Sequence, residues 1–234
     1  MLKGFEVRWE GELPAAPEAV WDAITRHADG YLWPIAYEPR VGGSERGLTP
    51  EGGEVTAWEP ARHFATRTER GAFNELDYRL EPLGPITYLR YVHRTEVPAD
   101  DFERQLDACR RHTTFYHHSL GQYACHFGGR QATYVSVDGP AASAEGGFAA
   151  LRDALGVPAC AIAGDPVRLA GPAPADGVVD YATDRFLGVR TPDALHRIYG
   201  RDAWGWPAGV AHHLVADGDG AEAAWRTWVE EVFA

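Results

Sequence analysis

Residues 100–127 read DDFERQLDACRRHTTFYHHSLGQYACHF and form the longest stretch of helical periodicity in the chain. Residues spaced three or four apart lie on one face of a helix. This spacing links Phe102, Leu106, Cys109, Thr113, Tyr116, Leu120, Ala124 and Phe127. Asp100 or Asp101 is placed to cap the start, and Gly128 follows the end. The stretch therefore predicts one long helix whose buried face carries polar as well as apolar side chains.

The segments before this helix alternate between apolar and charged residues, as half-buried strands do. A strand at 5–9 and a helix from residue 18 come first, and strands are then expected at 37–41, 53–59, 63–69, 75–81 and 87–97. In the last three strands the charged set should face water. The opposite set should face the long helix, and it consists of Phe64, Thr66, Thr68, Leu76, Tyr78, Leu80, Leu89, Tyr91 and His93.

The second half of the chain repeats this order in a shorter form. We expect strands at 131–137, 167–170, 177–182, 185–190 and 210–215, and helices at 148–155, 192–199 and 222–233. A solvated turn is expected at 217–220. The last helix carries Trp225 and Trp228, which should either close a small core or form an interface. The predicted organisation is two domains, residues 1–129 and residues 130–234.

Composition excludes several classes of partner. The net charge of −12 argues against nucleic acid and against an anionic membrane surface. No window of about 18 apolar residues predicts a membrane span. The three cysteines have no metal-ligand or disulfide spacing, so free thiols in a cytoplasmic protein are expected. No motif predicts a cofactor, and the neighbouring histidines His117-His118 and His212-His213 cannot chelate a metal by themselves.

Four pieces of the sequence resemble the START-like (SRPBCC) superfamily. They are ELPAAPEAVWDAI (12–24), EPRVGG (38–43), GEVTAWEPARHFATR (53–67) and the helix at 102–127. Within the superfamily they are most similar to the bacterial branch named for the activator of the heat-shock-protein-ninety ATPase. The resemblance implies an α+β helix-grip fold, in which a curved antiparallel sheet wraps a long C-terminal helix, followed here by a shortened second copy. It also implies a hydrophobic cavity between sheet and helix.

The residues expected to line that cavity come from strands, helix and cavity mouth. They are Trp33, Leu76, Tyr78, Leu89, Tyr91, His93, His112, Thr113 and Tyr116. A mostly apolar pocket with a few polar groups is typical of a small-molecule site. The alternative is a filled core in which every hydroxyl and imidazole finds an internal partner.

The function expected from these residues is binding of a small hydrophobic or aromatic molecule. One alternative is a cyclase or aromatase that acts on a polyketide-like substrate through His93, His112 or Tyr116. Binding is favoured over catalysis, because no carboxylate can be placed beside these groups. A second alternative, which rests on the resemblance alone, is a co-chaperone-like interaction protein. For the oligomeric state, both a homodimer and a monomer are compatible with the sequence.

Overall fold

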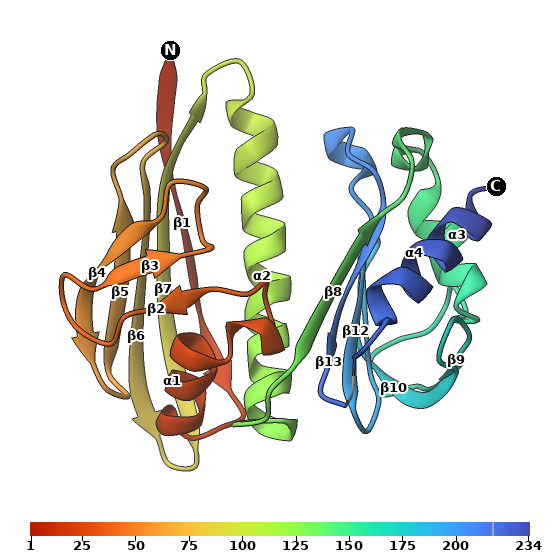
Figure 1. The fold of residues 1–234 in the computed structure, drawn as a ribbon, viewed down its shortest axis with the longest axis horizontal. Coiled ribbons are helices and arrows are strands. Elements are labelled where there is room, and N and C mark those ends of the chain that lie inside the picture. Colours follow the sequence, from red (N-terminus) through yellow and green to blue (C-terminus); the bar gives the residue numbers. More distant parts are fainter. Residues whose placement is uncertain (217) are drawn as a thin grey trace. The chain divides into compact units, whose positions relative to one another are not determined.

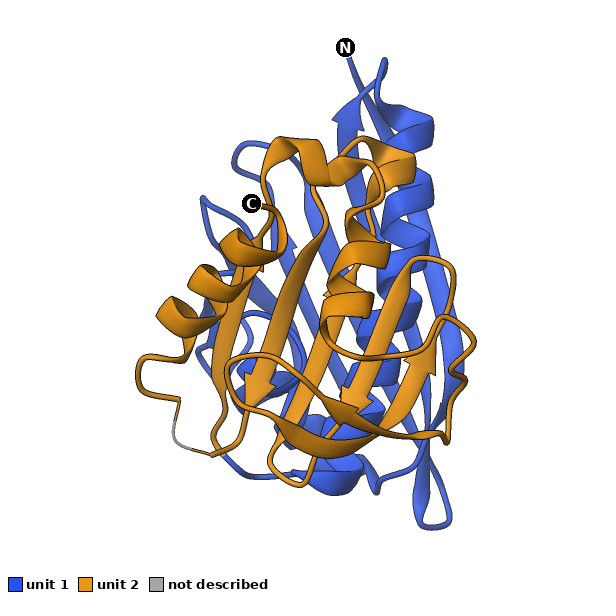
Figure 2. Ribbon diagram, turned by 90° about the vertical axis from the view of Figure 1, so that its right-hand side faces the viewer, with its two compact units in different colours: residues 1–130 blue, residues 131–234 orange. Residues whose placement is uncertain are grey.

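The chain folds into two compact units, which are coloured separately in Figure 2. The structure is a computed structural model that describes residues 1–216 and 218–234. The first unit comprises Met1–Arg130 and the second comprises Gln131–Ala234. The turn expected at 217–220 begins at Asp217, which lies outside the described residues.

The first unit is a seven-stranded antiparallel sheet with two α-helices (Figure 1). Its elements in chain order are β1 (Leu2–Leu13), α1 (Pro17–Arg26), a 3₁₀ turn (Ala28–Gly30), β2 (Ala36–Tyr37), β3 (Ser44–Arg46), β4 (Gly53–Glu59), β5 (His63–Thr68), β6 (Asn74–Leu83), β7 (Ile86–Pro98) and α2 (Phe102–His126). The strand order is β1-β7-β6-β5-β4-β3-β2, so the first strand pairs with the last one before α2.

Helix α2 extends along one face of this sheet, as the periodicity of residues 100–127 predicts (Figure 1). Asp101 occupies the N-cap position, but its side chain makes no capping bond to the backbone. Its carboxylate accepts bonds from Arg104 Nε at 2.5 Å and Gln105 Nε2 at 2.7 Å. The predicted helix boundaries are therefore close to the observed ones, while the expected capping bond is not formed.

Alternation in β5, β6 and β7 buries eight of the nine side chains that were predicted to face α2, and the ninth, His93, is half-buried. Phe64, Tyr78 and Leu89 are 0–5 % exposed. Cross-strand register places Phe64 opposite Tyr78, and Tyr78 opposite Tyr91. Since opposed residues in an antiparallel sheet lie on the same face, these rings share the inner face.

The second unit repeats the same connectivity with one strand fewer. Its elements are β8 (Thr133–Asp138), a 3₁₀ turn (Ala141–Ala144), α3 (Gly147–Ala154), β9 (Pro166–Leu169), β10 (Ala175–Ala182), β11 (Phe186–Arg190), β12 (Ala194–Tyr199), a 3₁₀ turn (Asp202–Trp204), β13 (Gly209–Leu214) and α4 (Ala221–Val232). The sheet order is β8-β13-β12-β11-β10-β9, so the first strand again pairs with the strand that precedes the final helix. Each unit is thus a helix-grip fold, and the second is a shortened copy.

Trp225 of α4 closes the core of the second unit, as one of its two predicted roles requires. It is 3 % exposed and belongs to the buried cluster that includes Val135, Leu151 and Val210. Its ring centroid lies 4.1 Å from that of His212.

The helix predicted at 192–199 is wrong, because this segment contains strand β12. All six residues of β12 are buried, so the strand lacks the alternation of polar and apolar residues that reveals a half-exposed strand. Even Arg197 is fully buried, and its guanidinium lies 3.0 Å from the Asp180 carboxylate. Because a buried arginine is rare, Arg197 did not indicate a buried strand at this position in the sequence.

The strand predicted at 37–41 is also wrong in its extent. Strand β2 ends at Tyr37, and a turn leads into β3. Pro39 has no N–H to donate to a ladder, which favours a break at this point. The Gly43 N–H donates to Arg40 O at 3.0 Å and closes the turn.

Candidate ligand site on the inner face of the first sheet

A cluster of tyrosines forms the centre of the inner face. The Tyr78 and Tyr91 rings oppose one another across β6 and β7, with centroids 4.8 Å apart. The Tyr31 and Tyr91 phenols lie near that of Tyr78 and act on its pKa. Burial raises the pKa of Tyr78 and of Tyr91, so both are neutral phenols at physiological pH.

His117 of α2 packs against this cluster, although it was outside the predicted set. Its ring stacks on Trp9 at 4.5 Å with an interplanar angle of 10°, and it lies 4.4 Å from the Tyr91 ring. Its Nδ1–H donates to Thr113 O at 2.8 Å. Burial lowers the pKa of His117 to about 4. The sequence contains a signal for this position, because His117 follows Thr113 by four residues and residues three or four apart lie on the same helix face.

A second polar group links His93 of β7 to α2. His93 Nε2–H donates to Asn74 Oδ1 at 2.7 Å, and the Cys109 thiol donates to His93 Nδ1 at 3.2 Å. Burial lowers the pKa of His93 to about 4 and raises the pKa of Cys109 to about 11. Both groups are therefore neutral near pH 7. The thiol holds the imidazole in one tautomer and is not poised as a thiolate nucleophile.

Three buried polar atoms on this face have no hydrogen-bond partner among the described residues. They are Thr66 Oγ1, Asn74 Nδ2 and Glu45 Oε2. Register places Thr66 opposite Leu76 and places Asn74 opposite Thr68. Because the great majority of buried polar groups in proteins are satisfied, these atoms, like His196 Nδ1 and His212 Nε2 of the second unit, call for a partner. Sequence alternation identified this face, but it could not show which atoms lack partners.

Three of the predicted residues form a partly exposed aromatic group at one side of α2. The Trp33 and Tyr116 rings are 6.0 Å apart and perpendicular, and the His112 and Tyr116 rings are 5.7 Å apart. Trp33 Nε1–H donates to Gly47 O at 2.8 Å, which holds the indole in place. His112 Nδ1–H donates to Ala108 O of its own helix.

The remaining predicted residues are buried at separate places on the inner face. Leu76 opposes His93 across the sheet, and Thr113 lies one helical turn after Cys109. Leu89 opposes Leu80 and Gly11, nearer the other end of the strands. The structure thus divides the predicted set into a tyrosine group, a group around His93 and the aromatic group at Trp33. Their role in binding a ligand stays a prediction.

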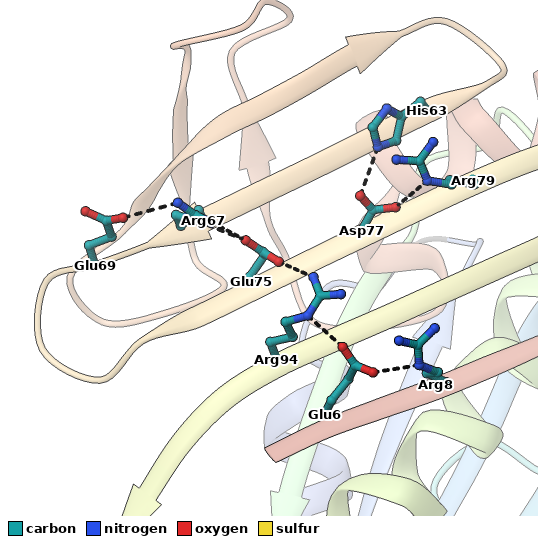
Figure 3. A network of polar contacts seen from close by, with 9 residues as sticks. All are labelled: Glu6, Arg8, His63, Arg67, Glu69, Glu75, Asp77, Arg79 and Arg94. Atoms are coloured by element: carbon teal, nitrogen blue, oxygen red, sulfur yellow. Dashed lines mark hydrogen bonds and ion pairs between the residues drawn. The ribbon is translucent and has the colours of Figure 1, made fainter. Parts of the chain in front are cut away.

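The outer face of the same sheet has a different character, because its charges neutralise one another (Figure 3). Carboxylates and guanidinium groups alternate across β5, β6, β7 and β1 in one chain of ion pairs: Glu69, Arg67, Glu75, Arg94, Glu6 and Arg8. Arg94 Nε lies 2.6 Å from Glu6 Oε2. A shallow hollow of about 370 Å³ on this face includes Arg8, Arg90 and Arg94, which already form ion pairs. These pairs leave little unbalanced charge for a ligand.

Within residues 1–216 and 218–234, no group of three or more His, Cys, Asp or Glu side chains could hold a metal ion. Over the same residues, none of the helices combines the length and apolar character needed to cross a bilayer.

The strand order and the final helix of each unit define a protein with two helix-grip units in tandem. No family model matches the chain, and a search of curated proteins finds no match. Among solved structures, protein MLL2253 from Mesorhizobium loti has 19 % sequence identity and a TM-score of 0.43, and the match covers 50 % of this chain and 95 % of that one.

Two other solved structures are similar at the same level. The Aha1 dimer of Colwellia psychrerythraea has 18 % identity and a TM-score of 0.42 over 51 % of this chain and 96 % of that one. DynU16, a protein of the dynemicin biosynthetic locus, has 17 % identity and a TM-score of 0.41 over 97 % of both chains. The fold assignment itself rests on the strand order and on the position of the final helix in each unit.

Proposed function

We propose that the first unit binds a small hydrophobic or aromatic molecule that carries an oxygen atom, between the inner face of its sheet and α2. The observation that carries this proposal is the pair of unsatisfied atoms Thr66 Oγ1 and Asn74 Nδ2 in an interior built mainly from rings and aliphatic side chains. An amide N–H requires an acceptor, and a hydroxyl can donate or accept. A hydroxyl or carbonyl oxygen on the ligand would satisfy them.

The free energy of this arrangement supports binding. Leaving a buried donor or acceptor unpaired destabilises a fold by about 1–3 kcal/mol. A ligand that forms hydrogen bonds with both atoms would therefore recover this free energy on binding. Aromatic residues on the same face, including Tyr78, Tyr91 and His117, offer flat apolar surfaces for the rest of the molecule.

The same groups favour binding over acid–base catalysis. A general acid or base works best with a pKa near the working pH. Burial moves the pKa of His93 and His117 down to about 4 and raises that of Tyr78 and Tyr91. None of these four groups would exchange a proton readily near pH 7.

A fluorescence titration with N-phenyl-1-naphthylamine, a neutral dye, tests the proposal. We expect saturable binding, displaced about tenfold more effectively by 2-naphthol than by 2-methylnaphthalene, because only the naphthol presents an oxygen. Asn74→Leu should abolish this preference. Glu75→Gln is the matched control, since this neighbour on β6 faces the ion-pair network and should leave the preference unchanged.

Two results would contradict the proposal. One is an absence of saturable dye binding to the wild-type protein. The other is an equal preference for the naphthol in the wild type and in Asn74→Leu. Native mass spectrometry of the freshly purified protein adds an independent check, because a retained molecule and the number of subunits would both appear in the measured mass.

A further inference from the structure

The side-chain amide of Asn74 on β6 has two ends with different surroundings. Its Oδ1 lies 2.7 Å from His93 Nε2 of β7, while its Nδ2 is buried and has no hydrogen-bond partner among the described residues. An amide oxygen only accepts hydrogen bonds, and an amide NH₂ group only donates them. The orientation of this one side chain therefore decides whether the inner face offers a ligand a donor or an acceptor.

His93 controls the orientation of the Asn74 amide through its tautomer. A neutral imidazole carries one N–H, so one ring nitrogen donates and the other accepts. Burial lowers the pKa of His93 to about 4, which keeps the ring neutral near pH 7. With its proton on Nε2, the imidazole donates to Asn74 Oδ1 and leaves the amide N–H groups for another partner. A proton on Nδ1 would favour the flipped amide, in which Oδ1 is the atom left without a partner.

Cys109 of α2 favours the tautomer with the proton on Nε2. Its Sγ lies 3.2 Å from His93 Nδ1, and burial raises the pKa of Cys109 to about 11, so the sulfur keeps its proton near pH 7. Sulfur is a weak acceptor, so the imidazole N–H is better used on Asn74 Oδ1, and the S–H is left to donate to Nδ1. The hydrogen bonds thus run in one direction, from Cys109 through His93 to Asn74.

The neighbours of Asn74 in the sheet do not supply the acceptor that Nδ2 lacks. Register places Thr68 and Thr95 opposite Asn74, one on each side. The Thr95 hydroxyl donates to Phe73 O at 2.9 Å, and Thr68 Oγ1 lies 3.2 Å from Thr49 Oγ1. Both hydroxyls therefore have partners of their own, and the Asn74 N–H groups remain available to a bound molecule.

We infer that Cys109 and His93 are positioning residues that make the inner-face site selective for an aromatic molecule with a carbonyl oxygen, such as an aryl ketone, over one that can only donate hydrogen bonds. The inference rests on the function proposed above and narrows its ligand class to hydrogen-bond acceptors. A carbonyl oxygen has two lone pairs and no proton, which suits the N–H groups of Asn74 and the hydroxyl of Thr66. Cys109 and His93 act through Asn74 and need not touch the ligand.

Competition of 1-indanone and of indole for bound N-phenyl-1-naphthylamine tests the inference on the full chain. The two bicyclic probes are similar in size, but 1-indanone only accepts hydrogen bonds through its oxygen, and indole only donates through its nitrogen. We expect the wild type to bind 1-indanone about tenfold more tightly than indole. Cys109→Ala removes the thiol donor and leaves His93 free to adopt both tautomers, so the ratio should fall to about threefold or less.

Two further variants make the test specific. Cys109→Ser keeps a hydrogen-bond donor at the same position and should preserve the wild-type ratio. Cys125→Ala removes the exposed thiol later in the same helix and should leave the ratio unchanged. A general loss of packing would weaken the binding of both probes alike, so the ratio separates positioning of the amide from a merely structural role.

The tautomer of His93 can be measured without a ligand. Long-range proton–nitrogen correlation spectra distinguish protonated from unprotonated ring nitrogens, and the His93 signals are identified by their absence from His93→Phe. We expect a proton on Nε2 alone in the wild type and a mixture of the two tautomers in Cys109→Ala. A wild-type His93 with its proton on Nδ1 would overturn the inference.

The outcomes of the binding experiments separate this inference from the proposed function. An absence of saturable dye binding removes both. If the dye binds and 2-naphthol is preferred to 2-methylnaphthalene, the proposed function stands. In that case, equal affinity for 1-indanone and indole, or the same ratio in the wild type and in Cys109→Ala, would overturn only the role assigned to Cys109 and His93.

Discussion

His117→Phe should reduce the loss of stability that the protein suffers at acidic pH. The imidazole is 4 % exposed and stacks on Trp9, and burial lowers its pKa from 6.5 to about 4. The folded state therefore holds His117 neutral, while the unfolded chain accepts a proton below pH 6.5. Because the unfolded state binds more protons, stability is present above pH 6.5 and falls as the pH drops towards 4.

The size of this effect follows from the two pKa values. Between pH 7.5 and pH 5.0, one such imidazole lowers the free energy of unfolding by about 2 kcal/mol. The side chains packed on His117 are Trp9, Tyr78 and Tyr91, which carry no charge in this range. Phe preserves the stacking on Trp9 and removes the titration. The variant should therefore lose about 2 kcal/mol less than the wild type over this interval.

Urea unfolding of both proteins at pH 7.5 and pH 5.0, followed by circular dichroism, measures the effect. The difference between the two proteins cancels the contributions of His93, His196 and His212, which have lowered pKa values and are unchanged in the variant. If His117→Phe shows the same pH dependence as the wild type to within about 0.5 kcal/mol, the reasoning about this buried imidazole is refuted.

Three other changes test the packing of the first unit. Gly30→Ala should lower the free energy of unfolding by about 1–3 kcal/mol, because the added Cβ would lie 2.2 Å from the Tyr123 ring. The control Gly4→Ala, whose Cβ would lie 3.8 Å from the nearest atom, should change the free energy of unfolding far less. Thermal melts of the two variants measure this difference. Thr66→Val should raise the free energy of unfolding by about 1 kcal/mol in a urea titration, because it removes an unpaired buried hydroxyl, and a loss of stability would show that the hydroxyl has a partner. Residues 1–130 expressed alone should melt cooperatively by circular dichroism, and a broad non-cooperative transition would contradict the autonomy of this unit.

Much of the fold can be predicted from the sequence where a segment has one buried and one exposed face. Residues 100–127 repeat apolar positions at steps of three and four, and helix α2 covers Phe102–His126. Strand β4 covers Gly53–Glu59 as predicted, and alternation in β5 to β7 identified the inner face correctly. Prediction failed at β12, where burial of both faces removes the alternation that distinguishes a strand from a helix.

The candidate sites could be predicted only in part, because hydrogen-bond partners lie far apart in the sequence. Sequence reasoning named His93 and the tyrosines, but the contact of His93 with Cys109 and Asn74 depends on how α2 and β6 meet in space. Glu45 looked like one charged residue among many in a turn. Only the paired strands showed that its carboxylate lies buried beside Gly53 with no opposite charge.

The sequence by itself determined the long helix and which side of each half-buried strand faces inwards, because these depend on local periodicity along the chain. The tertiary structure decided which inward polar groups are satisfied and which are left without partners. Thr66 and Asn74 are ordinary residues in the sequence, and they become candidate ligand contacts only when the folded interior removes water from them.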